Sequence, residues 1–256
     1  MPRKARKISS TKVYHIILRG NDRQDIFLDE KDYQKFIKEI INTKEKYQYD
    51  LLAYCLMSNH VHLILFDKNN NFSKAIQSLA ISYASYFSKK YDKVGHLFQN
   101  RFLSKNVETK EYLVQLCRYI HQNPVKAKIS KIEEYRWSSY QEYVKYYKIV
   151  ETRKIMSIFG TTEQEAIENF IKFHKSEEDN VNDYMEYEMV DRITDEQLRK
   201  RIEKILEIDN VMEIKKYNTK IRNEKIGKLK EIKGASISQI SRVININRKI
   251  IERAMK

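Results

Sequence analysis

At residues 54–66 the sequence reads Tyr54-Cys-Leu-Met-Ser-Asn-His-Val-His-Leu-Ile-Leu-Phe66, with two histidines separated by one apolar residue near its centre. Side chains alternate between the two faces of a strand, so His60 and His62 share one face. Ser58-Asn59 interrupts the apolar run and predicts a hairpin turn, with residues 51–57 as the partner strand. Two imidazoles at this spacing can bind one cation, or each can simply be hydrogen-bonded in a core.

A second stretch, residues 109–124, has the pattern of an amphipathic helix. Thr109 suits the N-cap, and Pro124 limits how far the helix continues. Tyr119 and Asn123 stand one turn apart, beside an apolar stripe. A phenol next to a carboxamide suits a nucleophile beside a metal ligand, with a divalent cation polarising the phosphate. The alternative is a tyrosine that only packs at a helix edge.

Five blocks of sequence, in this order, resemble the HUH-type single-tyrosine transposases, and more narrowly their REP-associated tyrosine transposase branch. They span roughly residues 10 to 145, a little over half of the chain. The blocks are Tyr14-His-Ile-Ile-Leu-Arg-Gly20, Tyr54-Cys-Leu-Met-Ser-Asn-His-Val-His62, Gly95-His-Leu-Phe-Gln-Asn-Arg-Phe102, Tyr119-Ile-His-Gln-Asn-Pro124 and Trp137-Ser-Ser-Tyr140.

The resemblance implies a metal-dependent nuclease and strand transferase that acts on single-stranded DNA, often at a hairpin. It maps the metal-binding histidines onto His60 and His62 and the nucleophile onto Tyr119, with Mg²⁺ or Mn²⁺ as cofactor and a 5′-phosphotyrosine intermediate. The third metal ligand is a glutamine in some relatives and maps onto Asn123, whose arm is shorter. Some relatives pair two chains so that each tyrosine serves the other's metal site, and the sequence leaves such a homodimer open.

The order of predicted elements is strand, helix, strand, strand, helix, strand, followed by the helix with Tyr119. This order fits an α+β fold, a ferredoxin-like antiparallel sheet with helices on one face, and the resemblance implies the same architecture. We expect this catalytic domain to occupy residues 1–150. An acidic helical connector is expected over residues 151–198, where Thr161 to Gln164 has a capping-box pattern, and an all-α domain over residues 199–256.

Charge separates these three parts. Residues 1–160 carry 29 Lys and Arg against 16 Asp and Glu (+13), residues 161–198 carry 3 against 12 (−9), and residues 199–256 carry 17 against 7 (+10). Two basic bodies around an acidic segment suggest two places that contact a polyanion. In the first body Arg19, Arg23 and Arg101 are candidates for DNA contacts, with solvated loop cations as the alternative.

The last stretch, residues 236–253, resembles a helix-turn-helix. Its second helix would enter the major groove of duplex DNA and present Arg248, Lys249 and Arg253. A basic helical bundle that contacts protein is the alternative.

Other classes of protein match the sequence less well. No apolar run reaches the length of about 18 residues that a membrane span needs, and no signal-peptide pattern stands at the start, so we expect a cytoplasmic protein without membrane contacts. Cys55 and Cys117 form neither a disulfide framework nor a metal or redox motif. A zinc hydrolase would need an acidic general base that the histidines lack. A domesticated, non-catalytic DNA-binding regulator remains the alternative to a transposase-like enzyme.

Overall fold

The computed structural model describes residues 7–146, 148–176, 193–232 and 234–255 of the 256-residue chain. They fall into two compact units, one within residues 1–185 and the other within residues 186–256. Each unit has a buried apolar core of its own. Among the described helices, none combines the length and the apolar character needed to cross a membrane.

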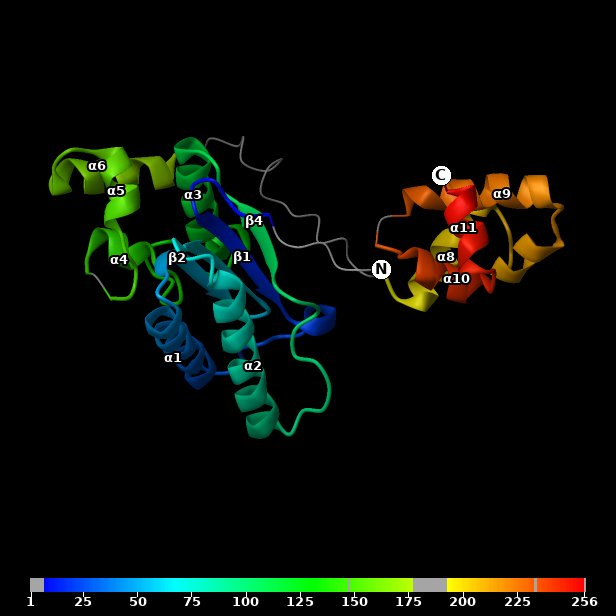
Figure 1. Ribbon diagram of the computed structural model, residues 1–256, viewed down its shortest axis with the longest axis horizontal. Helices are drawn as coiled ribbons and strands as arrows, with labels where there is room; N and C mark the ends of the chain where they lie inside the picture. Colours follow the sequence, from blue (N-terminus) through cyan, green and yellow to red (C-terminus); the bar gives the residue numbers. More distant parts are fainter. Residues whose placement is uncertain (1–6, 147, 177–192, 233, 256) are drawn as a thin grey trace. The chain divides into compact units, whose positions relative to one another are not determined.

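The first unit is built on a four-stranded antiparallel sheet with the strand order β2-β3-β1-β4 (Figure 1). Helices α1 and α2 connect β1 to β2 and β3 to β4, which gives the βαββαβ order of a ferredoxin-like fold. The predicted α+β class is therefore confirmed. The bounds are β1 Val13–Arg19, α1 Glu30–Tyr47, β2 Asp50–Met57, β3 His60–Phe66, α2 Phe72–Tyr91 and β4 Leu103–Asn106, with a short 3₁₀ turn, η1, at Asn21–Arg23.

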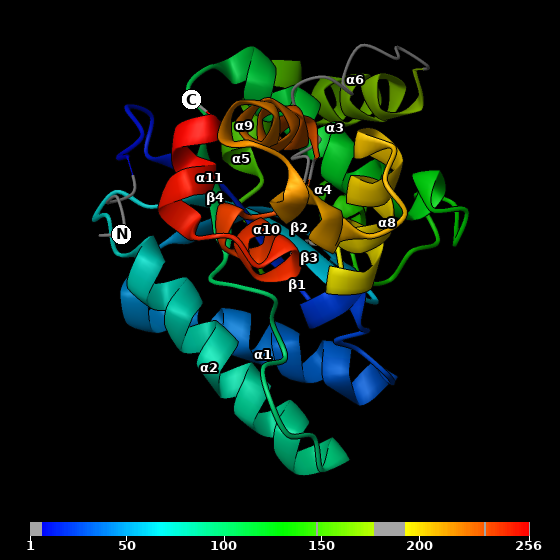
Figure 2. The same cartoon turned by 90° about the vertical axis from the view of Figure 1, so that its right-hand side faces the viewer.

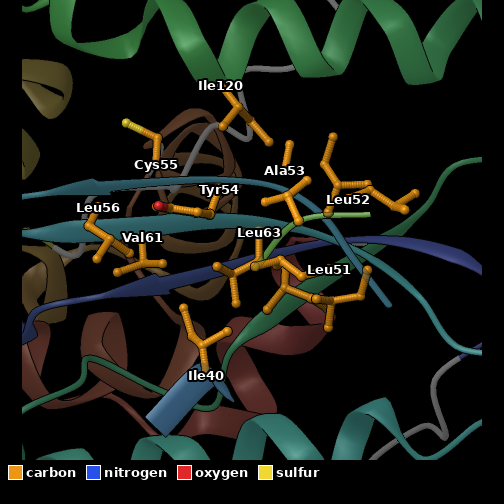
Figure 3. Close-up of a cluster of buried hydrophobic side chains, with 14 of the residues drawn as sticks. Ile40, Leu51, Leu52, Ala53, Tyr54, Cys55, Leu56, Val61, Leu63 and Ile120 are labelled. Carbon is orange, nitrogen blue, oxygen red and sulfur yellow. The ribbon is translucent and has the colours of Figure 1, made fainter. Parts of the chain in front are cut away.

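Helices cover both faces of this sheet. Helices α1 and α2 lie on one face, and α3 (Lys110–Lys126) lies on the other (Figures 1 and 2). Figure 3 shows Val61 and Leu63 toward Ile40 of α1, whereas Ile120 of α3 lies on the opposite side. The predicted ferredoxin-like sheet with helices on one face is confirmed by α1 and α2, and α3 adds a helix on the other face. Residues 51–57 are buried throughout, so both faces of the sheet need an apolar cover.

The predicted hairpin and the start of α3 are confirmed. Met57 pairs with His60 across a turn made by Ser58 and Asn59. The Thr109 side chain accepts a hydrogen bond from the backbone N–H of Tyr112, which caps the first turn of α3. Pro124 lies inside the helix, which ends two residues later.

Up to residue 176, where the described part of the first unit ends, its last elements are three short helices, α4 (Tyr140–Val144), α5 (Arg153–Phe159) and α6 (Glu163–Lys175). Helices α5 and α6 pack against α3, and Ile155 and Phe170 are fully buried in the core of this unit. The structure therefore puts residues 151–175 in the first unit, where the sequence had suggested a connector, because their apolar side chains complete its core. Residues 177–192, which belong to the same expected connector, lie outside the described residues.

Helix α6 begins one residue later than its sequence pattern suggested. Thr162, not Thr161, is the N-cap, because its hydroxyl accepts from the N–H of Glu165. The Glu165 carboxylate in turn accepts from the N–H of Thr161.

The second unit is all-α in its described residues, as predicted. Asn245 has a left-handed backbone (φ 50°) between α10 and α11, and the Asn247 side chain caps α11 by accepting from the N–H of Lys249. The elements are α8 Asp195–Leu206, η2 Val211–Lys216, α9 Thr219–Lys228, η3 Leu229–Glu231, α10 Ile237–Ile244 and α11 Arg248–Ala254.

Candidate active site between the sheet and helix α3

His60 and His62 lie on the face of β3 that α3 covers. Their ring centroids are 5.0 Å apart and the ring planes are nearly perpendicular. His62 is buried and His60 is half-buried at the strand's start, beside the hairpin turn. The alternation of side chains along β3 thus brings both imidazoles to one place, as the sequence pattern suggested.

The neighbouring strand β1 adds two side chains to this face. Arg19 pairs directly with His60, and Ile17 pairs with His62, so His15 is the diagonal neighbour of His62. The Nε2 of His15 lies 3.0 Å from the Nδ1 of His62. Sequence reasoning missed His15, although His15, Ile17 and Arg19 alternate with period two. The period assigns them to one face of β1, but only the strand register brings them to the histidines.

Both histidines of β3 are held neutral. Burial, with Arg19 nearby, lowers the pKa of His60 to about 4. Burial also lowers the pKa of His62 well below its usual value, and the rings of His60 and His15 add to the effect. Metal ions bind neutral imidazole, so protons do not compete for these nitrogens near neutral pH.

Tyr119 lies on α3 directly over this pair. Its ring centroid is 5.6 Å from that of His62, and the two rings meet edge to face. The ammonium of Lys126 lies 5.0 Å from the Tyr119 ring centroid, two turns along the same helix. A cation on the ring face stabilises negative charge that develops on the phenol oxygen. Helical spacing alone brings Tyr119, Asn123 and Lys126 to one side of α3.

Asn123 is oriented by the proline that follows it. Pro124 has no N–H, so the carbonyl of Ile120 lacks its helical donor. The side-chain Nδ2 of Asn123 replaces that donor, at 3.3 Å from the Ile120 oxygen and 2.8 Å from the Tyr119 oxygen. The Asn123 side chain also lies within hydrogen-bonding reach of His60. With its amide nitrogen already engaged, its oxygen is the atom that faces the His60 ring.

The geometry of these groups fits a divalent cation. The Nδ1 of His60 donates to the side-chain oxygen of Asn59 at 2.7 Å, which leaves the Nε2 of neutral His60 without a proton. The bare Nε2 of His60 and the side-chain oxygen of the neighbouring Asn123 are both groups that a cation can bind. Two imidazoles and an amide oxygen are a donor set that Mn²⁺ accepts, with Mg²⁺ favouring the oxygen.

The other basic candidates of the first unit lie at its surface. Arg19 is half-buried next to His60, and its neighbour Arg23 is exposed with a left-handed backbone (φ 63°). Arg101 is exposed in the loop before β4. The structure also brings Lys105 of β4 to this side of the sheet, because Lys105 pairs with His15. Arg19 and Lys105 therefore place positive charge beside the histidines of the candidate site, which suits phosphate groups.

In the second unit, Arg248, Lys249 and Arg253 are all exposed on α11. Arg248 forms an ion pair with Glu252 one turn later, at 2.8 Å. The basic residue of α10, Arg242, is instead bound by Asp195 of α8 at 2.7 Å. Helix α11 thus carries three exposed basic side chains, whereas α10 carries one.

Comparison with known proteins gives one family and several solved structures, of which two are described below. Residues 9–123 match the family model described as Transposase IS200 like. The chain is similar to the structure of a REP-associated tyrosine transposase bound to a REP hairpin, with 18% identity over 60% of this chain and 93% of that one (TM-score 0.49). It is also similar to a candidate transposase from Deinococcus radiodurans R1, with 18% identity over 47% of this chain and 97% of that one (TM-score 0.34). No curated protein matches at a significant level.

Proposed function

The N-terminal unit of this chain belongs to the IS200-like transposase family, and on that premise we propose that the chain is a metal-dependent single-stranded DNA endonuclease and strand transferase. One observation carries the proposal. The phenol of Tyr119 lies beside His62 while Asn123, one turn away, reaches His60, so a nucleophile and three metal-ligating groups share one small volume.

The reaction needs a phosphodiester as its only reactant. The Tyr119 oxygen attacks the phosphorus in line, the P–O3′ bond breaks, and a 5′-phosphotyrosine and a free 3′-hydroxyl are left. The phenol gives up one proton and the 3′ oxygen gains one, so the step needs no other reactant. Since one phosphate ester replaces another, the 3′-hydroxyl of the same or another strand can reverse the step without a nucleotide cofactor.

His60, His62 and Asn123 would hold the Mg²⁺ or Mn²⁺. The ion, when bound, supplies charge stabilisation at a non-bridging phosphate oxygen. Side chains of the protein orient the metal ligands, attract the substrate and surround the nucleophile. Asn59 fixes the tautomer of His60, Arg19 and Lys105 attract the phosphate, and Lys126 places a positive charge over the ring of Tyr119.

The proposed substrate is single-stranded DNA with a hairpin, as the family resemblance implies. The second unit is proposed to act as a helix-turn-helix that binds flanking duplex DNA through α11. The left-handed Asn245 after α10 and the Asn247 cap of α11 support this proposal. A non-catalytic regulator with the same fold would bind both DNAs and cleave neither, so strand cleavage separates the two functions.

A labelled hairpin oligonucleotide with single-stranded flanks tests the proposal, incubated with Mg²⁺, Mn²⁺ or EDTA. Wild-type chain should cleave it only with metal, and Tyr119→Phe should bind it without cleaving it. Tyr112→Phe is the matched control, because Tyr112 lies on the same helix and is half-buried. Metal-independent cleavage, or cleavage by Tyr119→Phe, would count against the proposed chemistry.

A further inference from the structure

A second group of potential metal ligands lies inside the first unit, made of Cys117, His121 and His174. Cys117 and His121 are one turn apart on α3, and His174 is in the last turn of α6. All three are buried, and their ligand atoms, Sγ of Cys117 and one nitrogen of each ring, lie within 4.8 Å of one another. None of the three belongs to the candidate active site.

The measured separations agree with a metal centre. The Nδ1 of His121 is 3.1 Å from the Nε2 of His174 and 3.8 Å from the Sγ of Cys117. Tetrahedral zinc, with Zn–N near 2.0 Å and Zn–S near 2.3 Å, sets ligand atoms about 3.3 Å (N to N) and about 3.5 Å (N to S) apart. Both distances are met to within a few tenths of an ångström. Cys117 and His121 meet through the spacing of one helical turn, whereas His174, 53 residues after His121, is brought to them by the packing of α6 on α3.

In both imidazole rings, the nitrogen that faces away from this group of ligands has a hydrogen-bond partner of its own. The Nδ1 of His174 donates to the carbonyl oxygen of Phe170 at 2.9 Å, so its Nε2 carries no proton. The Nε2 of His121 lies 2.8 Å from the hydroxyl of Ser139, which can accept from it while donating to the carbonyl of Tyr54. In the tautomer of His121 that donates its Nε2 proton to Ser139, both facing nitrogens carry lone pairs, 3.1 Å apart.

We propose that Cys117, His121 and His174 bind a soft or borderline transition-metal ion, Zn²⁺ or Cu⁺, that clamps α6 onto α3. A thiolate and two imidazoles are the ligands that both ions prefer. Binding displaces the thiol proton of Cys117 into solvent, and no oxidation or reduction takes place. Zn²⁺ has room in its coordination for one further small ligand, whereas Cu⁺ with one thiolate is electrically neutral, which suits a buried site.

The site would be a structural one with an effect on α3. That helix also carries Tyr119 and Asn123, whose positions depend on how α3 is held against the sheet. Arg118, buried on the same helix, hydrogen-bonds the carbonyl of Phe173 and the hydroxyl of Ser176, so α6 already closes over this part of α3. A metal would add a direct bond between the two helices at their buried side.

Metal-stripped full-length chain, titrated separately with Co²⁺ (the optical stand-in for Zn²⁺) and anaerobically with Cu⁺, tests the proposal. We expect one equivalent to bind with a thiolate-to-metal charge-transfer band, and the tightly bound metal to raise the Tm by roughly 5 °C. Displacement of Co²⁺ by Zn²⁺ assigns zinc, and a band with Cu⁺ alone assigns copper. The candidate active site has no thiol and contributes no such band.

Variants locate the site. Cys117→Ser and His174→Gln should each abolish the band, whereas Cys55→Ser, which removes the other buried cysteine, should leave it unchanged. If a variant fails to fold, the titration of the wild-type chain still shows whether a thiolate binds the metal. Wild-type chain that shows no thiolate band with either metal overturns the proposal, as does a band that survives Cys117→Ser. The contact between His121 and His174 would then be an ordinary hydrogen bond.

Discussion

Asn123→Ala is the substitution whose effects on stability and on metal binding can be separated. The change removes the Nδ2 that replaces the missing N–H of Pro124, so the carbonyl of Ile120 loses its donor. A lost hydrogen bond of this kind costs about 1 kcal/mol of unfolding free energy. It also removes the oxygen that faces His60. Loss of one group at a metal site weakens metal affinity roughly ten- to a hundredfold, or about 1.4–2.8 kcal/mol.

Gln122→Ala is the matched control. The Nε2 of Gln122 donates to the backbone oxygen of His174 at 2.8 Å, so this variant also loses an amide-to-carbonyl bond on α3. Both variants should therefore lose similar stability in urea melts. Only Asn123→Ala should need more Mn²⁺ for half-maximal cleavage, with a shift of ten- to a hundredfold. An unchanged Mn²⁺ requirement in Asn123→Ala would refute the assignment of Asn123 as third ligand.

Three further predictions concern other parts of the chain. Because Tyr119 lies beside His62 of its own chain, a mixture of Tyr119→Phe and His60→Ala chains should stay inactive, and restored cleavage would show action in trans. Burial lowers the pKa of His174 to about 3, so only the unfolded state gains this proton as the pH falls from 6.5 towards 3. The unfolding free energy, measured by urea melts in EDTA, should therefore decrease with acidification, and His174→Phe should reduce this dependence by about 1.4 kcal/mol per pH unit between pH 6 and 4. An unchanged dependence on pH in His174→Phe would contradict the prediction. A chain ending at residue 180 should still cleave a short single strand, but it should bind duplex DNA more weakly and with a smaller dependence on salt concentration. Arg248→Ala and Lys249→Ala should each cause part of that loss of affinity. Equal dependence of duplex affinity on salt for the full and shortened chains would exclude DNA binding by the second unit.

Local periodicity was enough to predict the hairpin, the face shared by His60 and His62, and the helical spacing of Tyr119 and Asn123. These features depend on neighbours within a few residues, where backbone geometry determines which side chains meet. The helix caps at Thr109 and Asn247 were predicted for the same reason.

Features that depend on packing between distant segments were not predicted. His15 reaches His62 only through the register of β1 against β3, which the sequence does not display. The position of α3 opposite α1 and α2 follows from a sheet that is apolar on both faces. The partnership of Cys117 with His174 depends on α6 folding back onto α3. Each case is decided by tertiary contacts between distant segments, and a sequence pattern of period two or 3.6 carries no information about such contacts.

The nucleophile is tested most directly by trapping the covalent protein–DNA intermediate. Wild-type chain incubated with Mn²⁺ and a hairpin DNA with single-stranded flanks should form an adduct that survives denaturation. After digestion, mass spectrometry should find the 5′-phosphate on the peptide that contains Tyr119, and Tyr119→Phe should form no adduct at equal DNA occupancy. An adduct on another residue, or one that persists in Tyr119→Phe, would contradict the proposed role of Tyr119.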